Sequence, residues 1–280
     1  MGKSKNSVGI MQGRLTPPKG RGIQFFPLGN WKREFKVAKK LGLGEIEFIF
    51  DFYKYRQNPL WSAKGRKQII KTIKDTGVKV NSICADYFMR KPFFRVGKHV
   101  QKPNIVILKR LVKYSSEIGA TLIEIPLVDN SSIKTAEEGD VFINIMKDVL
   151  PFLERYKVKM GLETDLPPKK TASLIKKINS FRVGANYDTG NSASLGYDPK
   201  EELELFGKHV LNIHIKDRRY KGSTVPLGTG DAQFKLFFRF LRKLGYNGSF
   251  ILQAARGKDG NEIMTTKSQV DFLKKYGLKT

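Results

Sequence analysis

Three side chains that could bind a metal ion stand at or near the ends of three successive apolar segments. They are Glu163 in segment 158–163, Asp188 in 183–188 and His214 in 209–217. Asp188 follows Glu163 by 25 residues and His214 follows Asp188 by 26, which is ample for one strand-plus-helix unit. Two carboxylates and one imidazole suit a single divalent cation: Mn²⁺, Mg²⁺, Co²⁺ or Zn²⁺. Singly, either acid could be a helix N-cap and the histidine a core residue, but three in successive units favour a metal site.

Parallel strands must position these residues, because parallel strands alternating with helices bring successive carboxyl ends to one face. We expect strands near residues 8–12, 45–50, 78–85, 121–127, 158–163, 183–188, 209–217 and 249–253. We expect helices near residues 30–41, 64–76, 103–118, 135–156, 168–179, 199–206, 231–244 and 261–276. Residues 86–102 read as a loop, and Pro151 predicts a break or kink in its helix.

Eight strand–helix units favour an α/β fold, a (β/α)₈ TIM barrel, with residues 1–280 forming a single domain. An open doubly wound sheet would give a similar pattern. Further polar residues would face the same site. Glu47 and Asn191 are candidate substrate ligands, and Glu124 is a second acid or base, or else a salt-bridged strand-end residue.

Four basic residues follow expected strands and could bind a hydroxyl, carboxylate or phosphate of a substrate. They are Arg14, Lys216, Arg218 and Arg256. The loops after the last strands of a barrel often hold phosphate, and a guanidinium matches phosphate with two parallel hydrogen bonds. A solvated basic loop is the alternative interpretation.

The chain carries 52 Lys and Arg against 26 Asp and Glu, a formal net charge of +26. The basic residues are spread along the chain, which favours lysine-rich helix exteriors over one anion-binding surface. The only cysteine, Cys84, lies in an apolar segment and reads as a buried residue in a reducing compartment. No segment has the apolar length of a signal peptide core or a membrane span. We expect a cytoplasmic protein with no membrane partner.

Several short segments resemble the xylose-isomerase-like TIM-barrel superfamily, in particular its sugar phosphate isomerase/epimerase group. The segments are 8–15, 161–163, 186–191, 213–217 and 227–230, of which His-Ile-Lys-Asp followed by Gly-x-Gly is the most specific. The resemblance implies a TIM barrel in which a glutamate, an aspartate, a histidine and a second glutamate hold one divalent ion. The first three carry over to Glu163, Asp188 and His214. The fourth falls on Gln253, whose oxygen can coordinate a cation but cannot act as a base.

The resemblance also implies the reaction. Relatives epimerise with two glutamates, and several carry a histidine at the position of Asn191, so this chain departs from the pattern twice. With Glu163 as the retained base, we expect enolisation of a keto sugar or sugar phosphate. A dehydratase acting on a keto sugar or keto-inositol, or a non-catalytic sugar-binding barrel, remains open. An endonuclease-IV-like repair enzyme would need many histidine ligands, and this chain has three histidines, so no nucleic acid partner is expected. Relatives often form homodimers or homotetramers.

Overall fold

The computed structural model describes residues 6–18, 20 and 22–278. The start of the chain, residues 1–5, lies outside the described residues. Eight parallel strands close into a barrel in the order β1-β10-β7-β6-β5-β4-β3-β2. They are β1 (Val8–Met11), β2 (Glu45–Ile49), β3 (Ser82–Cys84), β4 (Leu122–Leu127), β5 (Lys159–Thr164), β6 (Val183–Asp188), β7 (Val210–Ile215) and β10 (Phe250–Leu252). The expected (β/α)₈ TIM barrel is confirmed.

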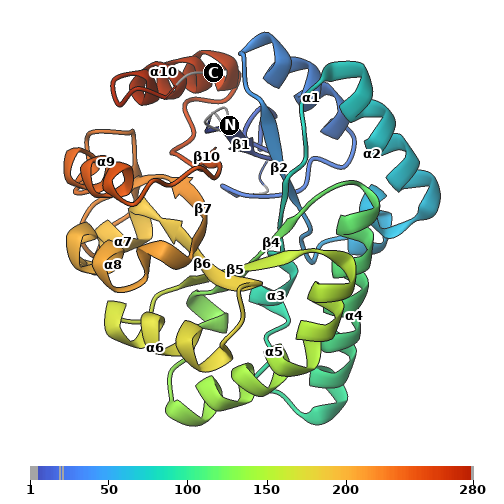
Figure 1. Cartoon of the computed structure of the whole chain (residues 1–280). Coiled ribbons are helices and arrows are strands. Elements are labelled where there is room, and N and C mark those ends of the chain that lie inside the picture. Colours follow the sequence, from blue (N-terminus) through green and yellow to red (C-terminus); the bar gives the residue numbers. More distant parts are fainter. Residues whose placement is uncertain (1–5, 19, 21, 279–280) are drawn as a thin grey trace.

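Helices surround the barrel and cover its outer face (Figure 1). The longer ones are α1 (Trp31–Lys40), α2 (Ala63–Thr76), α4 (Lys98–Glu117), α5 (Ala136–Tyr156), α6 (Pro168–Ile178), α8 (Pro199–Phe206), α9 (Phe234–Lys243) and α10 (Glu262–Lys274). Shorter ones are α3 (Tyr87–Arg90), α7 (Thr189–Leu195), η1 (Tyr55–Gln57), η2 (Pro59–Trp61), η3 (Asp129–Ser131) and η4 (Gly207–His209). A two-stranded antiparallel sheet, β8 (Asp217–Arg218) with β9 (Thr224–Val225), follows β7.

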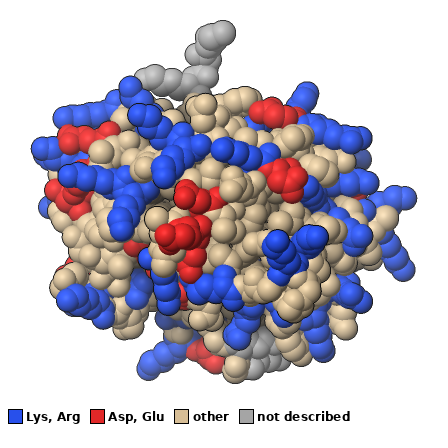
Figure 2. All heavy atoms as spheres, turned by 90° about the horizontal axis from the view of Figure 1, so that it is seen from below, with Lys and Arg blue, Asp and Glu red and all other residues tan. Residues whose placement is uncertain are grey.

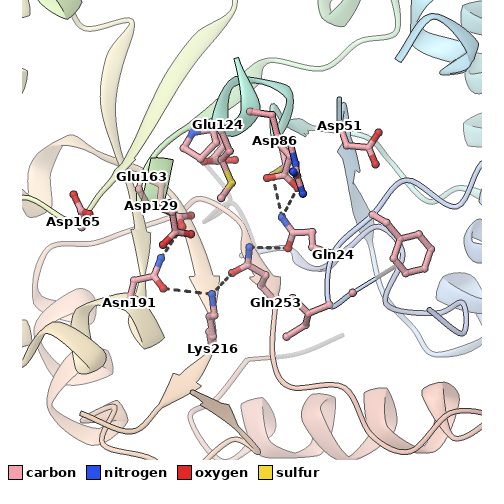
Figure 3. Close-up of a pocket in the computed structure, with 18 of the residues that line it drawn as sticks. Gln24, Asp51, Asp86, Glu124, Asp129, Glu163, Asp165, Asn191, Lys216 and Gln253 are labelled. Carbon is pink, nitrogen blue, oxygen red and sulfur yellow. Dashed lines mark hydrogen bonds between the residues drawn. The ribbon is translucent and has the colours of Figure 1, made fainter. Parts of the chain in front are cut away.

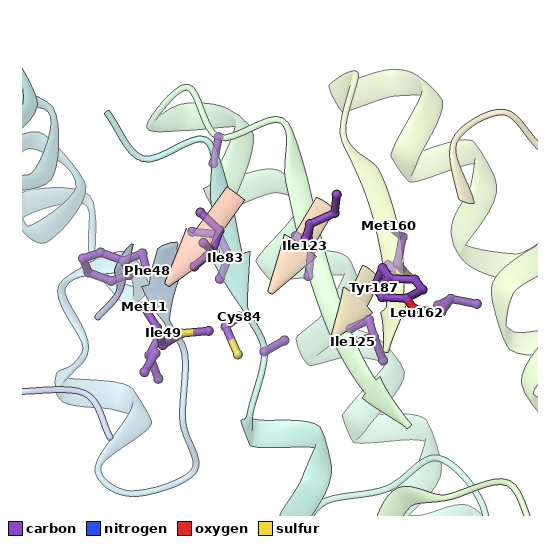
Figure 4. Packing of buried hydrophobic residues seen from close by; sticks show 14 of the residues in the cluster. Met11, Phe48, Ile49, Ile83, Cys84, Ile123, Ile125, Met160, Leu162 and Tyr187 are labelled. Atoms are coloured by element: carbon purple, nitrogen blue, oxygen red, sulfur yellow. The ribbon is translucent and has the colours of Figure 1, made fainter. Parts of the chain in front are cut away.

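The core lies between the strands and this helical layer (Figure 4). Ile83, Ile123, Met160 and Val183 are in register across β3, β4, β5 and β6, and all are buried. Because side chains alternate along a strand, the residues directly before and after each of these four face the barrel interior. Strands covered on both sides read as continuous apolar runs, which is why their sequences were recognisable. Cys84 is buried and unpaired, as expected.

Two local expectations about helices are wrong, and the break expected at Pro151 is not found. The segment expected to be a loop contains α3, and α4 begins at Lys98 rather than at Pro103. Pro103 is tolerated in its second turn, where it removes one backbone hydrogen bond. Helix α5 runs through Pro151 without a break. The short helix α7 was not expected, because its seven residues are too few for a recognisable apolar period.

Basic side chains are dispersed over the surface. Figure 2 shows Lys and Arg across one whole face, with acidic groups between them. Helix α6 exposes Lys169, Lys170, Lys176 and Lys177, as expected for lysine-rich helix exteriors. Among the described residues, no helix combines the length and apolarity needed to cross a membrane.

Two glycines in helices provide a matched test of packing in this fold. A Cβ at Gly65 of α2 would lie 2.1 Å from the backbone oxygen of Pro59 in η2. A Cβ at Gly139 of α5 would meet only Ile133 Cγ2, at 3.8 Å. We expect Gly65→Ala to lower the free energy of unfolding by roughly 1–3 kcal/mol and Gly139→Ala to raise it by about 0.5–1 kcal/mol. Urea denaturation of both variants measures this, and shifts of the same sign would contradict the packing of η2 on α2.

Candidate metal centre and substrate pocket

Glu163, Asp188 and His214 meet at the carboxyl end of the barrel. Glu163 is on β5, Asp188 is the last residue of β6, and His214 is on β7, directly opposite Asp188 in the register. Each offers one ligand atom such that all three atoms lie within 4.8 Å of one another. All three side chains are buried. The sequence prediction that these residues converge is therefore met by the geometry.

The orientation of His214 is fixed by Glu47 from across the barrel interior. His214 Nε2 lies 2.6 Å from Glu47 Oε1, and both side chains are 0% exposed. Its Nδ1 lies 2.9 Å from Glu163 Oε2 and makes no well-formed hydrogen bond. Burial disfavours the charged imidazolium, but the carboxylates of Glu47 and Glu163 raise the pKa of His214 well above its ordinary value. Once the proton on Nδ1 is lost, an Nε2–H donated to Glu47 would leave the Nδ1 lone pair for a metal, the carboxylate–histidine arrangement common in metal sites.

Amide side chains hold the candidate base. Asn186 Nδ2 donates to Glu163 Oε2 at 2.9 Å, and Asn191 Nδ2 donates to Glu163 Oε1 at 2.8 Å. Asn212 donates in turn to Asn186 Oδ1 and to Glu47 Oε2. Both carboxylate oxygens of Glu163 are thus oriented before any substrate binds.

Asp188 both ends its strand and caps the helix that follows. Its Oδ1 accepts hydrogen bonds from the backbone N–H groups of Gly190 and Asn191, each at 2.8 Å, at the start of α7. Its Oδ2 lies 3.4 Å from Lys216 Nζ. The helix-cap interpretation and the metal-ligand interpretation are therefore compatible, because the cap uses only Oδ1.

Gln253 follows β10 and reaches the same centre. Its Oε1 accepts from Lys216 Nζ at 3.3 Å, and its Nε2 donates to Gln24 Oε1 at 3.1 Å. Gln24 Nε2 donates to Asp86 Oδ2 at 2.8 Å, so a line of hydrogen bonds runs across the pocket (Figure 3). The amide therefore turns its oxygen toward Lys216 and its NH₂ toward Gln24.

A pocket of about 1080 Å³ opens above these residues. Six residues that the sequence predicts for the site line this pocket: Glu124, Glu163, Asn191, Lys216, Arg218 and Gln253. Aromatic residues from the early loops, among them Phe25, Phe26, Phe52 and Tyr53, form part of the wall. The pocket thus joins a polar floor to a partly aromatic rim.

Glu124 differs from the other carboxylates of the pocket. It is 1% exposed, and neither of its carboxyl oxygens has a hydrogen-bond partner within the described part of the chain. Burial, reinforced by the charge of Glu163, raises the pKa of Glu124 well above its ordinary value. A neutral carboxylic acid can donate a proton, so Glu124 is suited to act as an acid.

Three expected substrate ligands lie elsewhere. Glu47 is buried beneath the pocket against His214. Arg14 donates to the backbone oxygens of Ile23 and Gln253, and burial together with Arg256 lowers the pKa of Arg14 to about 9. The Arg256 guanidinium donates hydrogen bonds to the backbone oxygens of residues 13, 16 and 23. Both arginines attach the loop after β1 to the end of β10 and do not line the pocket.

Sequence reasoning missed several residues of the site. Asn186 and Asn212 each stand two positions before a predicted ligand, so the strand period could have placed them on the interior face. The sequence does mark Asp86 as a strand-end acid, though without a role; it lines the pocket, and burial raises its pKa to about 6. Gln24 lies in a loop, where no periodic signal marks it.

The donors present fit a divalent cation. Two carboxylates, a buried imidazole nitrogen without a well-formed hydrogen bond and a nearby amide oxygen are a mixed oxygen and nitrogen set. Such a set suits Mn²⁺, Mg²⁺, Co²⁺ or Zn²⁺. Glu163, Asp188 and His214 would hold the ion, with Gln253 as the fourth side chain.

Comparison with known proteins agrees with this geometry. The chain is 25% identical over 245 residues to L-ribulose-5-phosphate 3-epimerase UlaE of Escherichia coli (strain SMS-3-5 / SECEC), covering 80% of this chain and 81% of that enzyme. The fold matches the IOLI protein with a bound zinc atom, with a TM-score of 0.78, 16% identity, and coverage of 96% and 99%. It also matches a xylose isomerase-like TIM barrel protein from Mycobacterium smegmatis in complex with magnesium, with a TM-score of 0.72, 17% identity, and coverage of 99% and 98%.

The family model described as xylose isomerase-like TIM barrel matches residues 35–276. That range contains the three metal-ligand candidates and every strand of the barrel except β1. The resemblance noted in the sequence is confirmed, and the chain belongs to the xylose isomerase-like TIM barrel family.

Proposed function

We propose that this protein is a divalent-metal-dependent isomerase or epimerase that enolises a keto sugar or sugar phosphate, with Glu163 as the base. One observation carries the proposal. Glu163 belongs to the three-residue ligand cluster, lines the pocket and has both oxygens oriented by amides. The relative named as an L-ribulose-5-phosphate 3-epimerase supports the substrate class.

A phosphorylated substrate is favoured by one arginine of the pocket. Arg218 lines it and donates to the neutral oxygens of Gly222 and Asn191. Within the described part of the chain, Arg218 forms no ion pair. An arginine without a carboxylate partner is available to a phosphate or other anionic group.

The chemistry begins with removal of the proton α to the substrate carbonyl by Glu163. A bound cation would supply a Lewis acid that polarises substrate oxygens. Glu124, held as a neutral acid, donates a proton to the carbonyl oxygen, and the product is an enediol. Glu163 then returns its proton to the former carbonyl carbon, and Glu124 takes up a proton from the hydroxyl of the carbon that first lost its hydrogen, which becomes the new carbonyl. The net result is an aldose–ketose isomerisation.

The amide at Gln253 bears on whether the reaction is an isomerisation, an epimerisation or a dehydration. An amide has no basic lone pair for proton transfer at neutral pH, so this position cannot serve as a second base. One-base isomerisation therefore suits the site better than epimerisation through residue 253. A dehydratase is the second candidate, because Glu124 as a neutral acid could instead protonate a departing β-hydroxyl.

Replacing Glu163 with Gln should lower turnover by roughly 10²–10⁴-fold, because the base is lost while the side-chain shape is kept. Conversion of L-ribulose 5-phosphate and related keto sugars, with solvent deuterium uptake followed by NMR, measures the loss. Glu204→Gln, at an exposed position on α8, is the matched control and should keep full activity. Wild-type turnover in Glu163→Gln would rule out this base, and silence of the wild type toward all keto sugars would favour a binding protein.

Glu124→Gln should fold as stably as wild type, since an amide resembles the neutral carboxylic acid that burial favours here. Turnover should fall by about 10²-fold or more, because the acidic proton is gone. Thermal unfolding tests the expected stability, and the same conversion assay tests the expected loss of turnover. Destabilisation by several kcal/mol would show instead that an ionised Glu124 stabilises the fold.

Gln253→Glu should tighten Mn²⁺ binding, because a carboxylate adds a negative charge to the ligand set. We expect a gain of roughly tenfold or more, measured by isothermal titration calorimetry. Gln269→Glu is the control; Gln269 lies in α10, outside the pocket, and donates to the backbone oxygen of Ala255. Unchanged affinity in Gln253→Glu would place residue 253 outside the coordination shell.

A further inference from the structure

Lys216 lies on the side of the candidate metal centre that faces Gln253. Its Nζ is 3.4 Å from Asn191 Oδ1 and 3.3 Å from Gln253 Oε1 (Figure 3). The same Nζ is 3.4 Å from Asp188 Oδ2. Asp188 is a member of the candidate ligand cluster, and Gln253 is the expected fourth ligand. The ammonium group therefore contacts oxygens that a divalent cation would also need.

The position of this lysine is built into the fold. The Thr189 hydroxyl donates to the Lys216 backbone oxygen at 2.6 Å, and the Lys216 N–H donates back to the same hydroxyl at 2.9 Å. The lysine side chain passes over Gly190, where a Cβ would lie 2.6 Å from Lys216 Cγ. The side chain is only 15% exposed. These contacts fix Lys216 over the centre, whereas a surface lysine would extend into solvent.

The identity of residue 253 affects a divalent metal ion and the Lys216 ammonium group differently. A carboxylate there would attract a divalent ion about twice as strongly as it attracts an ammonium group at the same distance. The neutral amide of Gln253 attracts both cations less strongly and so reduces the energy difference between them. It still offers Lys216 an oxygen, and the amide NH₂ is directed away by Gln24.

We propose that Lys216 is an internal cation that competes with the divalent metal for Asp188 and Gln253, and that Gln253 shifts the balance toward the lysine. The proposal rests on the metal site of the proposed function. It makes metal binding in this protein weak and exchangeable, because binding must displace the ammonium group from both oxygens. Without the ion, Lys216 neutralises Asp188 and keeps the site folded.

The test is calorimetric titration of Mn²⁺ into wild type, Lys216→Met, Lys216→Arg and Arg218→Met. Removing the competing charge should tighten Mn²⁺ binding by roughly 10- to 100-fold in Lys216→Met. Lys216→Arg keeps the charge and should stay near wild type. Arg218→Met also removes one positive charge from the pocket, but Arg218 contacts neither Asp188 nor Gln253, so its effect should be clearly smaller. Circular dichroism checks folding, and Lys216→Gln replaces the methionine variant if that variant does not fold.

The alternatives give different results. Equal affinities for wild type and Lys216→Met would overturn the competition while leaving the metal site intact. Equal tightening in Lys216→Met and Arg218→Met would overturn it too, because only the general positive field would then matter. Absence of Mn²⁺ binding in every variant would overturn both this inference and the metal dependence, whereas the role of Glu163 as base is tested separately by turnover.

Discussion

The buried contact between His214 and Glu47 is the interaction on which the site depends. It joins β7 to β2 across the barrel interior, with both side chains fully buried. A buried carboxylate needs hydrogen-bond partners, and Glu47 also accepts from Ser82 and Asn212. Through Asn212 and Asn186 the same network reaches Glu163 on β5. One carboxylate oxygen of the candidate base is thus oriented from beneath the pocket, whereas Asn191, which lines the pocket, orients the other.

The three metal-ligand candidates were predictable because each follows an apolar strand, and parallel strands end at one face. The roles of Glu47, Arg14 and Arg256 could not be predicted in this way. Position along a strand says which end a residue is near, but not whether a partner across the barrel captures its side chain. Glu47 meets His214 from 167 positions away, and Arg14 meets the Gln253 backbone oxygen from 239 positions away. Such pairings follow from closure of the barrel, which local sequence does not encode.

Charge is arranged differently inside and outside the molecule. The surface carries most of the net charge of +26, which attracts anions toward the whole protein over long range. In the pocket, positive groups such as Lys216 and Arg218 stand beside Glu163 and Asp188. The approach of an anionic sugar is therefore favoured by the exterior, while its orientation depends on a few close contacts of both signs.

Closure of the barrel also sets when the site can exist. Strand β1 pairs with β10, and Arg14 and Arg256 fasten the loop after β1 to the far end of the chain. Glu47 belongs to the second strand–helix unit and His214 to the seventh. During synthesis on a ribosome, most of the barrel is therefore made before Glu47 has its imidazole partner. Until then Glu47 lacks its imidazole partner, and the centre assembles only as the last units emerge.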